Sequence, residues 1–453
     1  MIGHSGGRWS WLIFQVVAGT VLGGWFSPGL VSRVQADDWP QWLGPRRDGV
    51  WRETGVLSHF PAGGPRVLWR TPIAGGYAGP AVAAGRVFVT DYVTSGERKN
   101  DPGSRSELQG EERISCLDAR TGQLLWRHAY PCAYSISYPS GPRSTPTVQG
   151  GKVYVLGATG NLLCLEAESG KVVWSRELVQ DFQAPIPIWG FTSQPLVDGD
   201  KLLLIVGGPG SVVVAFHKDT GRELWRALDA KEQGYCSPTI IEAGGQRQLI
   251  IWHPQAIHGL DPESGRVFWQ VPLVPQYGMS IQLPLRHGDL LFAGGIGNQA
   301  VALRLDKDQP GVKEEWRGTN TTALYPTCGA PLIDEQGILY GACQQGHFRA
   351  VELATGKRLW ETFKPTTGTR FASSGTCFIV RQGERYFLMS ENGDLIIARL
   401  SAKGYDELDR AAVIKPTNEA FGRPVVWTHP AFANRTMVMR NDAEVVCVSL
   451  AAE

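Results

Sequence analysis

The chain has 453 residues, and its 44 Lys and Arg nearly balance its 43 Asp and Glu, which gives a formal net charge of +1. Such a balance creates no strong field, so it argues against a partner bound mainly through charge, such as nucleic acid or an anionic membrane. The 55 Gly, 29 Pro and 16 Trp are typical of many short strands joined by tight turns.

Residues 1–36 have the features of a secretory signal peptide. Arg8 supplies the positive start, an apolar stretch lies within 9–26, and a small-x-small cleavage segment ends at Ala36. A retained membrane anchor is the alternative, although anchors need roughly 20 apolar residues. No cysteine precedes Cys116, so we expect no lipid attachment behind the signal. We predict cleavage near Ala36 and export to the periplasm or the exterior.

Residues 37–66 follow the signal and lie outside the repeat described below. They contain an aromatic segment from Trp39 to Gly49. We expect this N-terminal strap to pack on one face of the fold. The next run, 67–70, has the sequence Val-Leu-Trp-Arg and matches the last strand of a repeat unit, although it precedes the first unit.

A turn ending in Gly and followed four or five residues later by Trp recurs along the chain, as from Gly122 to Trp126. The steps between these Trp residues from 126 to 360 are 48, 51, 44, 47 and 44 residues. A period of this length is typical of a radial or solenoidal repeat, and the short β-type runs argue against an α-solenoid. We predict that these Trp side chains are structural and reach the neighbouring sheet, where truncation to Ala would cost roughly 3–5 kcal/mol. They are Trp69, Trp126, Trp174, Trp225, Trp269, Trp316 and Trp360.

A second mark, a small or polar segment that ends in Pro before an apolar run, sets the number of units at eight, with a Ser-Gly pair in place of Pro in one of them. A typical unit from Pro146 to Trp174 contains four strands and three tight turns, which is the blade of a β-propeller. The eighth unit stops near Leu450 without a fourth strand, so we predict that 67–70 pairs with it and closes the ring. The sequence therefore predicts an all-β, eight-bladed propeller of four-stranded antiparallel blades over residues 67–453.

Two further features have a structural interpretation. Residues 94–113 are a polar, charge-rich insertion in the first unit, and we expect a long exposed loop there. The eight cysteines show neither a disulfide framework nor a CxxC motif. Cys116, Cys164 and Cys447 share one repeat position and are expected to be buried, and no zinc site is predicted.

The string from the apolar run through Thr/Ser-Gly to Trp resembles the PQQ-type propeller repeat, most clearly at 116–126, 164–174 and 350–360. Two groups of this class imply different functions. The quinoprotein dehydrogenases are eight-bladed enzymes that use pyrroloquinoline quinone (PQQ) and calcium. The BamB-like propellers are non-catalytic scaffolds of outer-membrane β-barrel assembly. The segment 39–49 also looks like the start of secreted PQQ-like repeat proteins without an assigned role.

In a propeller the innermost strands surround a central funnel, and we expect the segment before each unit to open onto it. These segments carry aromatic, amide and hydroxyl side chains and two Arg, but no Asp or Glu. Arg143 and Arg370 could hold an anionic group beside aromatic contacts, or Arg143 could pair with backbone carbonyls across the channel. The predicted funnel residues are Tyr138, Arg143, Trp189, Gln194, Tyr235, Gln282, Tyr325, Arg370 and His429.

The lack of carboxylates bears on catalysis, because a quinone–calcium enzyme needs them as cation ligands and as a base. We therefore expect no catalytic residue, metal or cofactor. We predict a non-enzymatic, exported, monomeric scaffold of the BamB-like class with envelope protein partners, and a membrane contact only if the signal stays as an anchor. Two alternatives remain open: a dehydrogenase that uses PQQ and calcium, and a propeller that binds a small anionic, glycan or peptide ligand in its funnel.

Overall fold

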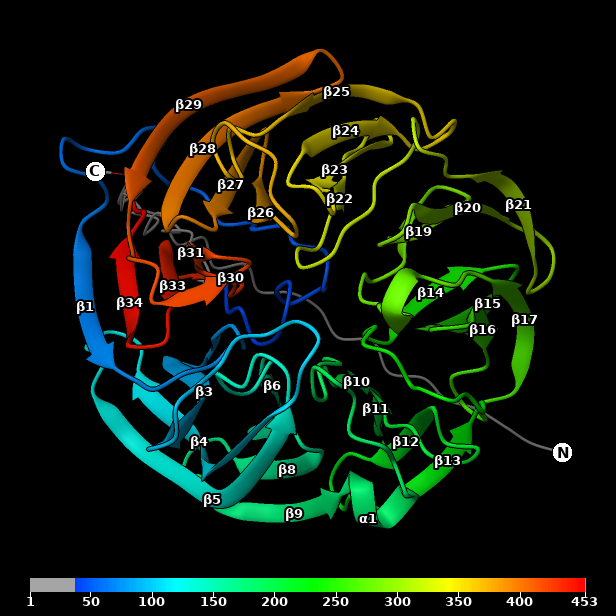
Figure 1. The fold of residues 1–453 in the computed structure, drawn as a ribbon, viewed down its shortest axis with the longest axis horizontal. Helices are drawn as coiled ribbons and strands as arrows, with labels where there is room; N and C mark the ends of the chain where they lie inside the picture. Colours follow the sequence, from blue (N-terminus) through cyan, green and yellow to red (C-terminus); the bar gives the residue numbers. More distant parts are fainter. Residues whose placement is uncertain (1–36, 453) are drawn as a thin grey trace, which may run out of the picture. The chain divides into compact units, whose positions relative to one another are not determined.

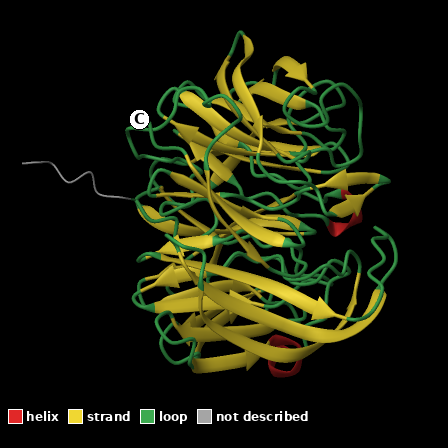
Figure 2. Cartoon of the chain, turned by 90° about the vertical axis from the view of Figure 1, so that its left-hand side faces the viewer, coloured by secondary structure: helices red, strands yellow, loops and turns green. Residues whose placement is uncertain are grey.

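The computed structural model describes residues 37–452, and their strands form a ring of eight antiparallel sheets (Figure 1). Each sheet has four strands, so the predicted eight-bladed propeller is confirmed. The predicted signal peptide lies outside the described residues. Figure 2 shows strands throughout this part of the chain, with helix only at isolated places. Helical structure within 37–452 is limited to α1 (Leu178–Phe182) and a 3-10 turn at Gln276–Gly278, and no helix there could cross a membrane.

The first four blades follow one another along the chain, and each runs from an inner strand to an outer strand. Their strands are β2 (Ala81–Ala83), β3 (Arg86–Thr94), β4 (Ser106–Asp118) and β5 (Leu124–Ile136) in blade 1; β6 (Thr147–Gln149), β7 (Lys152–Leu156), β8 (Asn161–Glu166) and β9 (Val172–Glu177) in blade 2; β10 (Leu196–Asp198), β11 (Lys201–Ile205), β12 (Val213–His217) and β13 (Glu223–Ala227) in blade 3; β14 (Thr239–Ala243), β15 (Gln246–His253), β16 (Ala256–Leu260) and β17 (Val267–Pro272) in blade 4.

Blades 5 to 7 repeat this order, and blade 8 takes its outer strand from the start of the propeller. Their strands are β18 (Leu285–His287), β19 (Leu290–Gly295), β20 (Gln299–Leu305) and β21 (Val312–Arg317) in blade 5; β22 (Leu332–Ile333), β23 (Ile338–Ala342), β24 (Phe348–Glu352) and β25 (Arg358–Thr362) in blade 6; β26 (Cys377–Gln382), β27 (Arg385–Ser390), β28 (Asp394–Ser401) and β29 (Gly404–Ala412) in blade 7; β32 (Ala431–Ala433), β33 (Thr436–Arg440), β34 (Glu444–Ser449) and β1 (Val67–Pro72) in blade 8.

The middle strands of the blades are buried on both faces, because each blade lies between two others. In β7, for example, every residue after Lys152 is buried. The tight turns between strands need unusual backbone angles. Gly150 and Gly151 join β6 to β7 with φ values of 58° and 75°, as expected for a two-residue hairpin turn that twists with its strands.

The strand β1 closes the ring. It pairs antiparallel with β34, placing Trp69 opposite Cys447 and Thr71 opposite Val445. Figure 1 shows β1 on the outer side of β34, although the two strands come from opposite ends of the described chain. The predicted closure is therefore confirmed, and it covers a strand edge that the last unit alone would leave open.

The repeated Trp residues link consecutive blades. The Trp126 ring N–H donates to the Ala167 carbonyl at 3.0 Å, and a Cβ at Gly170 would lie 2.5 Å from the indole. The turn Gly is thus required both by its φ of 72° and by the Trp that packs on it. The same hydrogen bond joins Trp69 to Ala119, Trp174 to Lys218, Trp316 to Leu353 and Trp360 to Ser401, while Trp225 packs on Gly265.

Trp269 differs from the other repeated Trp residues in its hydrogen bond. Its ring N–H donates to the Gln248 side chain at 2.7 Å, within its own blade. The next unit has the worn turn that ends at Gly311, and a Cβ there would meet only the Asp306 side chain within 4 Å. Trp269 still belongs to an apolar cluster that contains residues of blades 4 and 5. The indole therefore contributes to packing between blades without the crossing hydrogen bond.

The strap lies against the inner segments of the ring. Trp39 forms an antiparallel bridge with Val82 in blade 1, and Val50 forms a parallel bridge with Arg381 in blade 7. Between these bridges the turn from Trp39 to Gly49 crosses the centre of the ring. The strap therefore packs against the propeller, as predicted. This one short segment contacts blades that are distant in sequence.

Leu43 and Arg47 show how this turn is held. Leu43 packs in a small buried cluster with Leu283 and Ala330, and the Arg47 guanidinium donates to the Pro195 carbonyl at 3.1 Å. A second bond from Arg47 reaches the Pro238 carbonyl at 3.3 Å. These contacts come from inner segments of blades 3 to 6. The turn from Trp39 to Gly49 therefore closes the centre of the ring and forms the floor of the cavity described next.

The insertion at 94–113 is only partly a loop, so the predicted long loop is wrong in its second half. Strand β4 begins at Ser106, and β4 and β5 have 13 residues each. Tyr92 and Tyr134 stack at 3.9 Å between ring centroids and give the extended hairpin an apolar side. Strand pairing with buried aromatic partners outweighed the polar composition on which the loop prediction was based.

Candidate functional site

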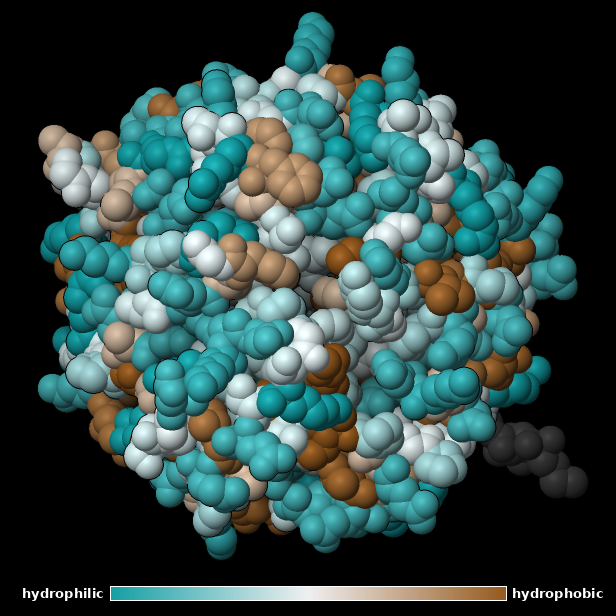
Figure 3. Space-filling view, in the orientation of Figure 1, coloured by the Kyte–Doolittle hydropathy of each residue, from teal (hydrophilic) through white to brown (hydrophobic). Residues whose placement is uncertain are grey.

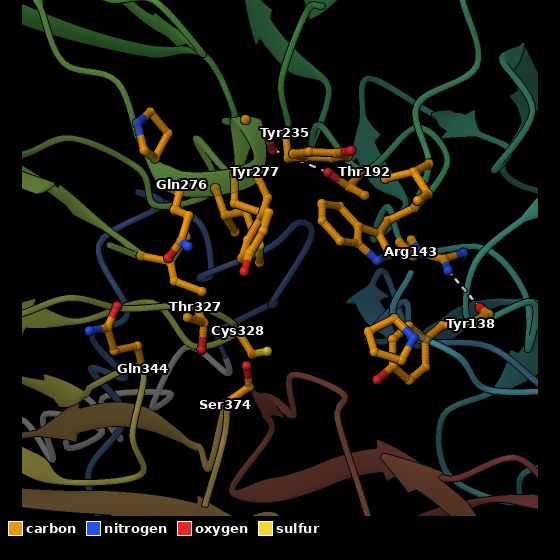
Figure 4. A pocket seen from close by; sticks show the side chains of 18 of the residues that line it. Tyr138, Arg143, Thr192, Tyr235, Gln276, Tyr277, Thr327, Cys328, Gln344 and Ser374 are labelled. Atoms are coloured by element: carbon orange, nitrogen blue, oxygen red, sulfur yellow. Dashed lines mark hydrogen bonds between the residues drawn. The ribbon is translucent and has the colours of Figure 1, made fainter. Parts of the chain in front are cut away.

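A cavity of about 1190 Å³ lies at the centre of the propeller, above the floor formed by the strap. Its lining comes from the connecting segments before and between the blades and from Trp42 of the strap. Figure 4 shows side chains from several blades pointing into this space. Six of the nine predicted funnel residues line it: Tyr138, Arg143, Trp189, Gln194, Tyr235 and His429.

The other three predicted residues lie outside the cavity lining. Gln282 is buried, and its amide oxygen accepts from the Gly294 N–H at 2.8 Å. The Tyr325 hydroxyl donates to the Thr319 carbonyl at 2.5 Å, with the ring in a buried cluster of blades 5 and 6. Arg370 is exposed on the loop before blade 7. Their backbones follow the predicted repeat positions, but the first two side chains turn into the blades.

Arg143 is committed to its own loop. Its guanidinium donates to the carbonyls of Gly141 at 2.9 Å, Ser137 at 2.8 Å and Tyr138 at 2.6 Å, and it lies 5.0 Å from the Tyr77 ring centroid. Burial lowers the pKa of this guanidinium from its ordinary value. The predicted anion site of two Arg residues is not assembled, since Arg370 is absent from the lining and Arg143 is used structurally. The carbonyl pairing that we considered occurs within one loop rather than across the channel.

Aromatic rings form much of the cavity wall. Trp189 and Tyr235 lie 5.4 Å apart at an angle of 56°, and both line the cavity. On another side, Tyr138 and Trp427 are 6.1 Å apart, and Phe421 lies 6.3 Å from Trp427. The faces and edges of such rings offer large apolar contact areas to a ligand.

The floor of the cavity contains a histidine held between two aromatic rings. The His429 ring lies 4.3 Å from Phe378 and 5.6 Å from Trp42 of the strap. Burial lowers the pKa of His429 to about 3, so its imidazole is neutral at physiological pH. The imidazole therefore adds no charge to the floor, where it lies between Phe378 and Trp42.

Exposed hydrophobic side chains surround the mouth of the cavity. Val274, Tyr277, Phe371 and Phe421 are 59%, 68%, 58% and 46% exposed, and all four belong to the cavity lining. Figure 3 shows a mostly hydrophilic face on which hydrophobic and intermediate side chains gather near the centre. The predicted funnel residues did not include these four side chains, although Phe371 follows the predicted Arg370 and the aromatic–Gly pairs at 277–278 and 421–422 were a usable sign of exposed turn aromatics.

Phe421 stands at the tip of a small hairpin between blades 7 and 8, formed by β30 (Asn418–Ala420) and β31 (Arg423–Val425). Arg423 anchors this hairpin through a buried ion pair with Glu391, with Nε 2.7 Å from Oε1. The same carboxylate accepts from the Trp427 ring N–H at 3.2 Å. A buried charged network thus holds the hairpin that carries Phe421, together with Trp427.

Several lining residues have backbone angles that bulky side chains rarely adopt. Tyr138, Tyr277 and Phe421 have φ values of 50°, 59° and 51°, and Ser374 has 54°. Left-handed backbone of this kind concentrates at ligand-binding and functional sites. Tyr138 is also 7% exposed, and its buried hydroxyl has no hydrogen-bond partner among residues 37–452. These features mark the cavity as a candidate functional site.

Charged groups in the lining are few. Lys231 and Glu232 are exposed and bring one charge of each sign, and Arg143 is the third charged residue. Glu232 corrects the expectation that the funnel contains no acidic residue. The adjacent side chains of opposite sign leave the cavity close to neutral overall.

The residues present do not fit a quinone–calcium centre. Calcium takes about six to eight oxygen ligands, with carboxylates among them. Glu232 is the lining's one carboxylate, and the buried Glu391 nearby is already bound to Arg423 and Trp427. Within the described chain, no group of three or more His, Cys, Asp or Glu side chains is arranged to hold a metal ion. We therefore derive no chemistry through this cofactor.

Curated relatives of two kinds share the repeat. The outer membrane protein assembly factor BamB of Salmonella typhimurium is 28% identical over 197 residues, which cover 41% of this chain and 44% of that protein. A polyvinylalcohol dehydrogenase of Pseudomonas sp. is 23% identical over 327 residues, or 54% of this chain and 50% of that protein. The chain thus spans about half or less of the length of these relatives.

Solved structures show the same fold. BamB from Moraxella catarrhalis superposes with a TM-score of 0.55 at 14% identity, covering 85% of this chain and 99% of that chain. A europium-containing methanol dehydrogenase gives a TM-score of 0.58 at 12% identity, covering 91% and 89%. The family model described as outer membrane protein assembly factor BamB matches residues 110–279 and 253–453. The chain therefore belongs to the family of the outer membrane protein assembly factor BamB.

Proposed function

We propose that this protein is an exported, BamB-like scaffold that acts by binding rather than by catalysis, and that the mouth of its central cavity is the binding surface. The observation that carries this proposal is the group of exposed apolar side chains at the mouth, Val274, Tyr277, Phe371 and Phe421. Clustered exposed apolar surface on a soluble domain marks interaction sites.

The partner that we propose is a protein of the cell envelope. Interface centres are enriched in aromatic residues. This mouth carries Tyr277, Phe371 and Phe421, and the exposed charges of the lining are the adjacent Lys231 and Glu232, which have opposite signs. The relatives named as outer membrane assembly factors support an envelope setting, and residues 1–36 support export. The left-handed backbone of Tyr277 and Phe421 holds these two side chains in place before any partner arrives.

The experiment places a photo-crosslinking amino acid at Tyr277 or at Leu125. Both positions carry exposed hydrophobic side chains, but Leu125 lies on the outer strand β5, away from the mouth. In the native envelope fraction, we expect a discrete crosslinked protein from position 277 and not from position 125. Equal labelling at both positions, or none at 277, would contradict the proposal.

A dehydrogenase is the second candidate, because the polyvinylalcohol dehydrogenase relative matches a longer stretch of this chain than the BamB relative does. Titration of the purified protein with PQQ and Ca²⁺ tests it. From the donor set around the cavity we expect neither a stoichiometric quinone absorbance nor reduction of an artificial electron acceptor. A one-to-one chromophore that reduces the acceptor with an alcohol would replace the binding proposal with an enzyme.

A further inference from the structure

We infer that the cavity itself binds the end of a neutral glycan chain. This inference goes beyond the proposed function, because it assigns a ligand of another class to the cavity behind the protein-binding mouth. Three properties of the cavity lead to it: aromatic faces, uncharged hydrogen-bonding side chains, and a large volume that is closed at the floor.

The aromatic faces suit sugar rings. A pyranose has one face covered by C–H groups, and these carry a slight positive charge that is attracted to the negative face of an aromatic ring. Trp189 and Tyr235 form a pair in the wall, and Tyr277 stands at the mouth. In Figure 4 the labelled Tyr235 and Tyr277 lie near each other on one side of the cavity. A chain of sugar units could therefore pass from the mouth aromatics to the wall.

The polar lining is neutral and able both to donate and to accept hydrogen bonds. Gln276, Thr327 and Ser374 are labelled in Figure 4 and line the same space, whereas the Gln344 amide is bound to the Gly297 N–H and to the Asn298 side chain. Amides and hydroxyls of this kind match a ligand whose hydroxyl groups also donate and accept. Arg143 is bound to three carbonyls of its own loop, and Lys231, the other cation of the lining, is followed directly by Glu232 of opposite charge.

The buried hydroxyl of Tyr138 is the second observation that points to a ligand. It has no partner among the described residues, and leaving such a group unpaired costs about 1–3 kcal/mol. Tyr138 also lines the cavity and has a left-handed backbone. A ligand hydroxyl that reached this side chain would satisfy it.

A peptide fits the cavity less well than a glycan. Proteins that capture extended peptides commonly pair them with a free strand edge several residues long. Here six of the eight inner strands are short, with three residues in β2, β6, β10, β18 and β32 and two in β22, while β14 has five residues and β26 has six.

The volume and the floor define which part of a glycan would enter. Sites for small ligands usually have volumes of ~300–1,000 Å³, whereas this cavity has about 1190 Å³. It therefore has room for several sugar units. The strap blocks passage through the ring, as shown by the contacts of Leu43 and Arg47 with the inner segments. The structure is thus suited to a chain end rather than to the middle of a chain.

The test is calorimetric titration of the protein spanning residues 37–452. The ligands are the neutral oligosaccharides cellohexaose, maltohexaose and chitohexaose, and their disaccharides. We expect at least one hexasaccharide to bind and to bind more tightly than its disaccharide. Tyr277→Gly should weaken that binding about ten-fold, and glycine adopts the left-handed backbone of this position without strain. Tyr138→Phe should weaken it by a similar factor without lowering the melting temperature of the free protein, because the lost hydroxyl is unpaired.

Two controls and three contrary results make the test decisive. Tyr325→Phe makes the same chemical change outside the cavity, and Leu125→Ala removes an exposed side chain on β5; neither should change glycan affinity.

Failure of every neutral hexasaccharide to bind would overturn the inference, as would preference for a charged hexasaccharide or for a neutral hexapeptide. Binding that is unchanged by both Tyr277→Gly and Tyr138→Phe would also overturn it, because the ligand would then lie elsewhere. A failed glycan test together with crosslinking at position 277 would leave the proposed protein-binding function intact.

Discussion

The Gly that ends most repeat turns is constrained in two ways, by its own backbone and by a side chain of the preceding blade, and Gly311 is the exception. Gly170 has a φ of 72°, and a Cβ there would lie 2.5 Å from the Trp126 ring. Gly221, before the next Trp, meets the Trp174 ring at 2.6 Å in the same way. A repeat motif that looks like a local turn signal therefore also encodes contact between blades.

This double constraint predicts a difference between two Gly→Ala variants. Gly151 has a similar φ of 75°, but no atom lies within 4 Å of a Cβ built on it. Gly151→Ala should lower the free energy of unfolding by about 1–2 kcal/mol through backbone strain alone. Gly170→Ala should lower it by a further ~1–3 kcal/mol, because the new methyl group displaces the indole. Chemical denaturation of both variants checks this, and equal losses would show that the indole contact does not matter.

At the scale of elements, β1 and the strap have separate roles although they are adjacent in sequence. The strap at 37–66 provides the floor of the cavity, whereas β1 completes blade 8 and links it to blade 1 through Trp69. Without β1, the edge of β34 would be unpaired and available to another chain.

Truncation can separate these roles. We compare chains that start at residues 37, 67 and 73. The chain that starts at residue 67 should stay monomeric with a closed ring, but it lacks the strap that forms the floor of the cavity. The chain from 73 should lose at least ~3–5 kcal/mol, the cost of removing a buried Trp, and should self-associate through β34. Light scattering and denaturation measure both effects, and a monomeric chain from 73 with unchanged stability would show that β1 does not close the ring.

At the scale of the whole molecule, stability should depend on pH through histidines buried in the ring. His253 and His258 stack at 4.8 Å in blade 4. Burial, and then the neighbouring His253, lower the pKa of His258 to about 4, against an ordinary value of 6.5. Below pH 6.5 the unfolded chain therefore binds a proton that the folded chain does not bind. The free energy of unfolding should fall as the pH drops from 6.5 to 4, and this contribution should level off below that range.

The His258→Gln variant tests this dependence. It should reduce the loss of stability between pH 6.5 and 4 by on the order of 2–3 kcal/mol, because Gln cannot take up the proton. His59 is exposed, and His59→Gln serves as the matched control. Carboxyl groups such as Glu112, whose pKa is raised by burial, act in the opposite direction, so the comparison must be made between variants over the same pH range. An unchanged acid slope in His258→Gln would contradict the prediction.

The sequence by itself determined the propeller, its eight blades and the strand that closes it. These features depend on turn chemistry and on the spacing between Gly and Trp, which are local and recur in each unit. The composition of the funnel was predictable in part, since Trp189, Tyr235 and four other predicted residues do line the cavity.

Only the tertiary structure decided which side chains share the cavity. Tyr325, like Tyr235, lies in the segment before an inner strand, yet its ring turns into the space between blades and its hydroxyl donates to the Thr319 carbonyl. Tyr277 and Phe421 come from connections far apart in the chain, both have positive φ values, and both line the cavity. The direction of a side chain in a connecting segment depends on such backbone angles and on the packing of neighbouring blades. Neither is encoded in the repeat spacing, so the binding surface emerged only when the ring was closed.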